Sequence, residues 1–153
     1  MSAKAKNKIL LVEDDADTRF ALAMLFELEG FEVVNAADGE EAYLRAVTEH
    51  PDLIVTDINM PKVSGLDLIR LVREDGRIAG VPIVAMSAVE KQQLNRAIEL
   101  GAVAVCQKPI EFDNFLSLIA KIVSARRMRN RSHNRTERRR SKHRDCESMS
   151  NQN

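Results

Sequence analysis

The sequence has little cysteine and no long apolar run, and both absences limit the class of protein. Its two cysteines, Cys106 in an apolar segment and Cys146 near the C-terminus, cannot form a disulfide framework and suggest a reducing cytosol. No apolar stretch approaches the roughly 18 residues that a membrane span needs, and residues 1–8 lack the apolar core of a signal peptide. We therefore expect a soluble, cytoplasmic protein without a membrane span.

Charged residues are plentiful, but the two signs are separated along the chain. Residues 1–125 carry 13 Lys and Arg against 20 Asp and Glu, a net charge of −7. Residues 126–153 carry 10 against 3, a net charge of +7. The first part is long enough for one domain with a hydrophobic core, which we place at residues 7–125. The second part has almost no apolar residues, so we predict a basic, disordered tail over residues 126–153.

Five short apolar runs alternate with segments of helical periodicity. The apolar runs at residues 8–12 and 53–55 indicate strands buried on both faces, and the alternation of five strands with helical segments predicts an α/β fold of parallel βαβ units with helices on both faces of the sheet. Asp17 and Asp38 are the expected N-caps of the first two helices. The helix at residues 90–100 has a narrow apolar stripe and should be held weakly. The runs are Lys8–Val12, Phe31–Ala36, Leu53–Asp57, Val81–Met86 and Val103–Cys106.

Polar side chains follow four of these strands. Asp14 and Asp15 come after the first, Asp57 ends the third, Ser87 follows the fourth and Lys108 follows the fifth. The carboxyl ends of parallel strands meet at one edge of a sheet, where open α/β proteins bind ligands. The five side chains should therefore converge.

This combination of side chains favours phosphoryl chemistry. Carboxylates at 4 Å repel each other by about 4 kcal/mol per pair at an effective dielectric constant near 20, so three together need a cation. Oxygen ligands without His or Cys favour Mg²⁺. Lys108 supplies a positive charge and Ser87 a hydroxyl donor for an anion beside Asp57. Carboxylates can accept phosphoryl groups, so we predict phosphoryl transfer to Asp57.

The same residues, with Met60-Pro61, Gly65 and Lys108-Pro109, make residues 7–125 similar to the receiver domain of two-component response regulators. The resemblance implies a flavodoxin-like (βα)5 fold with a doubly wound, five-stranded parallel sheet in the order 2-1-3-4-5. It also implies a cis peptide before Pro109.

The resemblance further assigns roles in the site. It implies Asp57 as the phosphoacceptor, with Asp15, Asp57 and the main-chain carbonyl of Asn59 on Mg²⁺ and Asp14 acting through water. Ser87 and Lys108 would contact the phosphoryl oxygens. The implied donor is a phosphohistidine on a sensor histidine kinase or phosphotransfer protein, and the only catalysis is of the domain's own phosphorylation and dephosphorylation.

Two positions depart from the family pattern. Val105 stands where receivers commonly have an aromatic residue, so the usual serine-to-aromatic relay is not expected. Val89 stands where a polar side chain would help water reach the phosphoryl group, so we predict slow self-dephosphorylation.

The function that these residues favour is that of a single-domain response regulator, which signals by changing its binding partner. One alternative is a phosphatase-like hydrolase with Asp57 as nucleophile, but such an enzyme would be expected to have an acidic residue at position 59, where this chain has Asn. Another alternative is a binding module that is never phosphorylated, and the presence of all the expected acidic residues argues against it. The expected partner surface combines residues 90–100, 103–107 and 111–125. Nucleic-acid binding is not favoured, because the tail has no aromatic residues and no room for a known DNA-binding module, although its charge leaves the question open.

Overall fold

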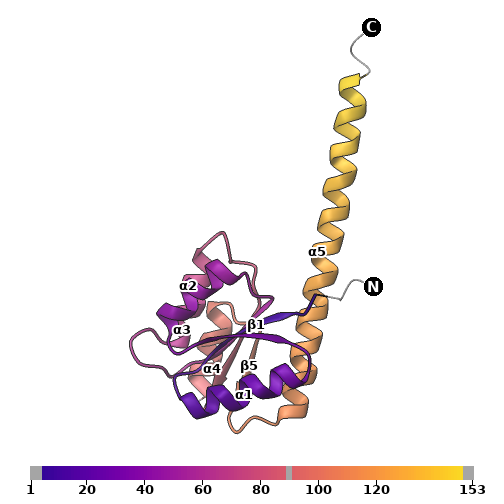
Figure 1. Cartoon of the computed structure of the whole chain (residues 1–153). Coiled ribbons are helices and arrows are strands. Elements are labelled where there is room, and N and C mark those ends of the chain that lie inside the picture. Colours follow the sequence, from indigo (N-terminus) through magenta and orange to yellow (C-terminus); the bar gives the residue numbers. More distant parts are fainter. Residues whose placement is uncertain (1–4, 89–90, 150–153) are drawn as a thin grey trace. The chain divides into compact units, whose positions relative to one another are not determined.

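The computed structural model describes residues 5–88 and 91–149. Strands and helices alternate along the chain (Figure 1), as the apolar runs predict. The strands are β1 (Lys8–Val12), β2 (Glu32–Ala36), β3 (Leu53–Asp57), β4 (Ile83–Ser87) and β5 (Ala104–Gln107). The helices are α1 (Ala16–Leu28), α2 (Gly39–Glu49), α3 (Gly65–Glu74), α4 (Lys91–Leu100) and α5 (Phe112–Met149).

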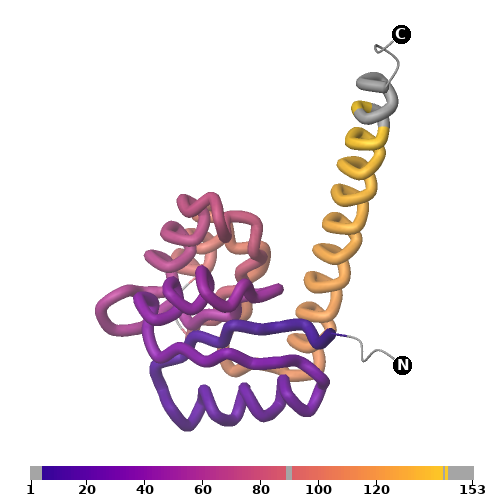
Figure 2. Tube along the Cα trace, turned by 45° about the horizontal axis from the view of Figure 1, so that its top comes forward, coloured from indigo at the N-terminus to yellow at the C-terminus, as the bar shows by residue number. Residues whose placement is uncertain are grey.

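The strands form one parallel sheet in the order β2-β1-β3-β4-β5. This order confirms the flavodoxin-like fold that the resemblance implied. Helix α1 lies on one face of the sheet, and α2, α3 and α4 lie on the other (Figures 1 and 2), with α3 in contact with both of its neighbours. The order places β1, β3 and β4 at the centre of the sheet, with their carboxyl ends at one edge.

The central strands are buried in the hydrophobic core. In β1, Leu10 and Val12 join the cluster under α2, α3 and α4. Ile9 and Leu11, the alternate residues, are equally buried but lie outside that cluster, as expected for side chains on the opposite face. Every residue of β3 and β4 is buried. Two-sided burial explains why these strands have uninterrupted apolar sequences.

The helix starts agree only partly with the sequence. Asp38 caps α2 as predicted, with its side chain accepting a hydrogen bond from the Glu41 N–H at 2.8 Å. The N-cap of α1 is Asp15, so the assignment of Asp17 was wrong. Asp17 lies in the first turn of α1, where its carboxylate interacts favourably with the helix dipole but does not cap the helix.

Arg73, in the last turn of α3, links α3 to the C-terminal end of α4. Its guanidinium donates hydrogen bonds to the Gly101 carbonyl at 2.8 and 3.1 Å, and to the carbonyls of Ala79 and Val81 at 2.8 and 2.6 Å. Burial lowers the pKa of Arg73 from its ordinary value. Four hydrogen bonds from one cation compensate for the cost of burying it.

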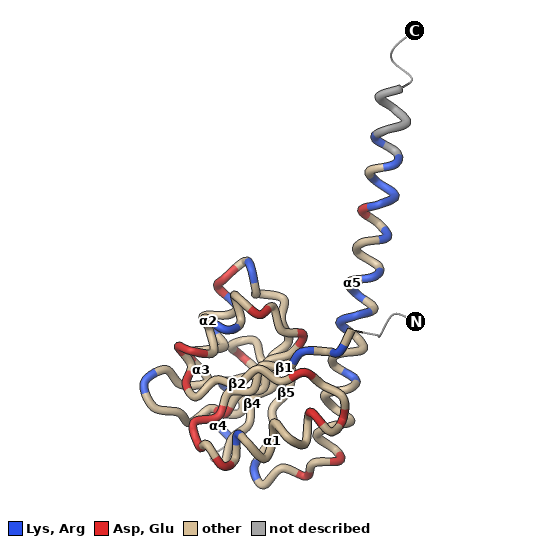
Figure 3. The backbone as a smooth tube through the Cα atoms, in the orientation of Figure 1, with Lys and Arg blue, Asp and Glu red and all other residues tan. Residues whose placement is uncertain are grey.

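Helix α5 extends into the basic segment. The chain divides into two compact units, Met1–Phe115 and Leu116–Asn153, so the boundary falls inside α5. The sequence predicted a disordered tail over residues 126–153; in the structure α5 continues through the described part of this segment to Met149. Lys and Arg are dense along this part (Figure 3). Both are good helix formers, and no Gly or Pro occurs after Pro109 to end the helix.

Among the described residues, no helix is both long enough and apolar enough to cross a membrane.

Candidate functional site

Three carboxylates gather at the carboxyl edge of the sheet. Asp57 is the last residue of β3, while Glu13 and Asp14 directly follow β1, the neighbouring strand. Each of the three offers a carboxylate oxygen, and these oxygens all lie within 4.8 Å of one another. Glu13 and Asp57 are buried and Asp14 is exposed. The cluster therefore opens to solvent on the Asp14 side.

Lys108 supplies the positive charge at this edge. It follows β5, and its backbone N–H donates to the Ser87 carbonyl at 2.8 Å, which ties it to the end of β4. Its Nζ atom lies 3.1 Å from Asp57 Oδ2 and 3.2 Å from Glu13 Oε2. One ammonium group thus bridges two buried carboxylates, one directly after β1 and one at the end of β3.

Burial and neighbouring charges shift the pKa values of Glu13 and Lys108. Burial, followed by repulsion from Asp57, raises the pKa of Glu13, and Lys108 offsets this only in part. Burial alone would lower the pKa of Lys108, but its hydrogen bonds and charge attraction to Asp57 and Glu13 raise it. Lys108 is therefore fully protonated at neutral pH. Even so, Glu13 remains less acidic than a free carboxyl group, chiefly because it is buried.

Glu13 occupies the place that sequence reasoning gave to Asp15. The Asp15 side chain accepts hydrogen bonds from the Thr18 N–H at 2.9 Å and the Thr18 hydroxyl at 2.5 Å, and these bonds lower its pKa. It is committed to capping α1 and does not join the carboxylate cluster. The available signal was position, because Glu13 is the first residue past the buried strand.

Ser87 and Asn59 lie at the same edge. Ser87 is the last residue of β4 and is fully buried. Asn59 is exposed, and its N–H points to Asp57 Oδ1 at 3.3 Å. Their roles toward a phosphoryl group and a metal remain predictions.

The remaining expectations concern the loops and β5. The cis peptide expected before Pro109 is present. Val105 is half-buried and packs against the core. Val89, on which the prediction of slow dephosphorylation depends, lies outside the described residues.

Gly65 lets the start of α3 lie close to Asp57 at the end of β3. Its N–H donates to the Ile58 carbonyl at 2.9 Å, and Ser64 caps the helix that begins at Gly65. The missing Cβ leaves room for the backbone of Asp57 and Ile58, because a Cβ at this position would overlap the Asp57 carbonyl oxygen. The close approach of α3 to the end of β3 therefore requires glycine.

The ligand atoms at this edge suit Mg²⁺. They are carboxylate oxygens with no His or Cys among them, which is the hard-oxygen set that Mg²⁺ prefers. Asp14 is exposed, so the cluster is open to water, and Mg²⁺ usually keeps several water ligands. The residues present thus fit a magnesium ion.

Comparisons with known proteins agree with this geometry. Residues 9–120 match the family model of the response regulator receiver domain. The transcriptional regulatory protein SphR of Synechococcus elongatus, named for alkaline phosphatase synthesis, is 40% identical over 119 residues, covering 71% of this chain and 45% of SphR. The transcriptional regulatory protein PdtaR of Mycobacterium tuberculosis is 36% identical over 124 residues, covering 80% of this chain and 59% of PdtaR. The chain spans about half the length of these curated relatives.

Solved structures resemble the fold over nearly their whole length. The chemotaxis protein CheY4 of Vibrio cholerae superposes with a TM-score of 0.72 at 27% identity, covering 77% of this chain and 99% of CheY4. A response regulator receiver protein from Pseudomonas putida has a TM-score of 0.72 at 32% identity, covering 78% of this chain and 99% of that protein. These similarities concern the fold.

Proposed function

This chain belongs to the response regulator receiver domain family, and from that premise we propose that it accepts a phosphoryl group on Asp57 from a phosphohistidine donor in the cytoplasm and signals through phosphorylation-dependent partner binding. Receiver domains are phosphoacceptor modules of two-component signalling, with magnesium typical of the family. The observation that carries the proposal is the contact of Lys108 Nζ with Asp57 Oδ2 at 3.1 Å beside Glu13 and Asp14.

The proposed transfer needs positioning and charge more than covalent assistance. A carboxylate oxygen of Asp57 forms a bond to phosphorus while the N–P bond of the donor breaks, and the electron pair of that bond stays on the imidazole nitrogen. Lys108 would hold a phosphoryl oxygen with the Nζ that now contacts Asp57, and Ser87 would donate its hydroxyl to another. The burial of Asp57 and Glu13 strengthens these interactions, because water screens them less.

We assign the metal to Glu13, Asp14 and Asp57, with the main-chain carbonyl of Asn59 as a further ligand. When bound, Mg²⁺ neutralises charge on the phosphoryl oxygens and on the carboxylates. Glu13 and Asp14 would hold the metal beside Asp57, where it offsets the negative charge of the incoming phosphoryl group. Asp15 is left out of this set because its side chain caps α1.

Incubation of the full chain with acetyl phosphate and Mg²⁺ tests the proposal. We expect intact-mass spectrometry to detect one added phosphoryl group per chain, and none after a chelator removes the metal. Absence of modification with Mg²⁺ present would contradict the assignment. Repeated turnover of a generic phosphate ester would instead favour the phosphatase-like alternative.

Replacement of Glu13 by Gln tests which acidic residue serves the metal. We expect the Mg²⁺ affinity to fall by at least about tenfold, since even partners without a direct bond to a metal contribute about 10- to 100-fold. Asp15→Asn is the matched control, because Asn is an equally good N-cap and should leave the affinity unchanged. Titration with Mg²⁺ by calorimetry measures both. A loss of Mg²⁺ affinity in the Asp15 variant alone would favour Asp14 and Asp15 as the metal-binding pair, as predicted from the sequence.

The Glu13→Gln variant also has a predicted effect on stability without metal. The raised pKa of Glu13 means that folding favours its protonated form. This contribution is complete below the carboxyl group's ordinary pKa and is lost as pH rises through the raised value. We therefore expect the metal-free variant to be at least as stable as wild type at pH 7 in urea denaturation. A clear loss of stability would show that the Lys108 bond outweighs the cost of burying the charge.

An exposed apolar stripe on α1 suits the donor. Phe20, Met24 and Leu28 recur every four residues and are 68%, 47% and 78% exposed. α1 begins directly after the carboxylate cluster, so a helical donor that packs on this stripe would bring its phosphohistidine to the same edge of the sheet.

The proposed output surface includes α4 and β5. Only Ala97 of α4 is buried, which agrees with its narrow apolar stripe. Ile98 and the adjacent Val103 are 46% and 51% exposed. Phosphorylation of Asp57 changes the charge at the end of β3 by one to two units, beside the end of β4. The weakly packed α4, which contacts β4, is the element that this change could displace.

A further inference from the structure

The basic part of α5 lies outside the family match, which ends at residue 120. Residues 126–144 contain ten Lys and Arg and one acidic residue, Glu137. Every side chain from Met128 to Lys142 is exposed. This density of charge on one helix far exceeds what solubility requires.

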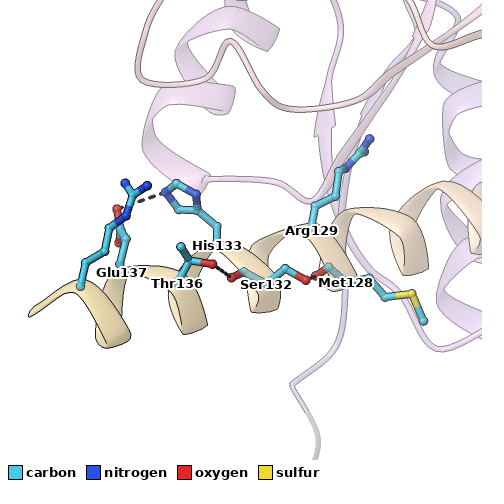
Figure 4. A pocket seen from close by; sticks show the side chains of 7 residues that line it. Met128, Arg129, Ser132, His133, Thr136 and Glu137 are labelled. Carbon is cyan, nitrogen blue, oxygen red and sulfur yellow. Dashed lines mark hydrogen bonds and ion pairs between the residues drawn. The ribbon is translucent and has the colours of Figure 1, made fainter. Parts of the chain in front are cut away.

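The basic residues are arranged in stripes. Arg131, Arg135, Arg138 and Lys142 are spaced by four, three and four residues, so they share one face along about 16 Å of helix. Arg129, His133 and Arg140, spaced by four and seven, form a second basic stripe, part of which is visible in Figure 4.

A less charged stripe lies between the two basic ones. It consists of Asn130, Asn134, Glu137 and Ser141, each one position before a residue of the first stripe. Glu137 is engaged by His133 at 3.1 Å (Figure 4). On the far side of the helix lie Met128, Ser132 and Arg139, and the Ser132 hydroxyl donates back to the Met128 carbonyl at 3.1 Å. One side of the helix thus has an amide-bearing centre with positive flanks.

Double-stranded DNA fits this arrangement. The major groove of B-DNA is about 12 Å wide and admits one α-helix between two phosphate backbones. The basic stripes would face these backbones, while Asn130 and Asn134 would face base edges, where Asn pairs with adenine.

Other anionic partners fit less well. Met128 is the only large apolar residue in residues 126–144, so the segment lacks the apolar face with which amphipathic helices enter lipid. No aromatic residue follows Phe115, so bases of a single strand have nothing to stack on. The major groove of duplex RNA is too narrow for side chains to read.

We propose that residues 126–144 of α5 bind duplex DNA through the major groove, with the two basic stripes on the phosphates. This activity rests on the helix alone and does not depend on phosphorylation of Asp57. It revises the expectation from the sequence, which took account of the aromatic content of the segment but not of its helical faces.

Fluorescence anisotropy of the full, unphosphorylated chain on a mixed-sequence duplex of roughly 30 base pairs, about three helical turns, tests the proposal. Binding should weaken steeply as salt rises from roughly 50 to 200 mM, because each phosphate contact releases counterions. In the triple variant Arg131→Gln, Arg135→Gln and Arg138→Gln, the salt slope should become shallower by about 2.7 and the affinity should fall at least about tenfold.

A matched triple variant separates this site from general charge effects. Arg45→Gln, Arg70→Gln and Arg96→Gln remove three exposed helical arginines from the first unit and should leave DNA binding unchanged. Gln preserves helix propensity, and circular dichroism verifies the helix. The proposal is overturned if the two variants lose binding equally or if wild type does not bind. Tighter binding to the single strand or to phosphatidylserine vesicles than to the duplex would also overturn it.

Discussion

Asp57→Asn will abolish phosphorylation by acetyl phosphate. Asn has nearly the same shape as Asp, so the β3 end, the Asn59 N–H contact and the packing of Gly65 should persist. What disappears is the anionic oxygen that attacks phosphorus, and an amide oxygen is a far weaker nucleophile. We expect the loss to be complete within the sensitivity of intact-mass spectrometry.

Asp17→Asn is the control for this experiment. Asp17 is an exposed carboxylate in the first turn of α1, near the site in sequence but outside the cluster. This variant should be phosphorylated like wild type. Modification that survives in Asp57→Asn, at any residue, would refute the phosphoacceptor assignment.

Gly65→Ala will strongly destabilise the protein, although it adds only one methyl group. The new Cβ would overlap the Asp57 carbonyl oxygen and crowd the Ile58 Cα at 2.8 Å, and both atoms belong to buried backbone. Backbone atoms cannot move aside as a flexible side chain can, so α3 must shift away from β3. We expect a loss of about 3 kcal/mol in the free energy of unfolding, measured by urea denaturation.

The same substitution should also impair phosphorylation, because the displaced backbone carries Asp57. Gly80→Ala is the matched control, since nothing lies within 4 Å of a Cβ at that position. Its stability should stay within about 0.5 kcal/mol of wild type. Equal stability of the two variants would show that α3 can adjust without cost.

The sequence was most informative where burial leaves no choice. Uninterrupted apolar runs bounded by polar residues are typical of strands covered on both sides, so the central strands and the edge at which Asp57, Ser87 and Lys108 lie could be predicted. The choice between Glu13 and Asp15 could not. Three consecutive acids follow β1, and which of them caps α1 depends on the turn after the strand, where one residue of shift exchanges the inward and outward side chains.

The basic segment shows a different limit. Low hydrophobicity and high charge correctly indicate that residues 126–149 cannot build a core of their own. Low hydrophobicity and high charge do not exclude a helix, because Arg and Lys side chains lose little conformational freedom in one. Side-chain pairs four residues apart, such as His133 and Glu137, also stabilise the helix. The amino-acid composition of a segment indicates whether it can form a buried core. It does not indicate whether the segment is helical, because that depends on the helix propensity of each residue and on local contacts.

The hydrogen bonds from Arg73 determine how α4 can move. They fasten the carbonyl of Gly101, just past the last turn of α4, to the end of α3. Sliding of α4 along its axis would break both bonds, whereas swinging of its opposite end would keep them. α4 should therefore pivot about Gly101. A rearrangement near Ser87 would then move the first turn of α4, which lies closest to the phosphorylation site, more than its last turn.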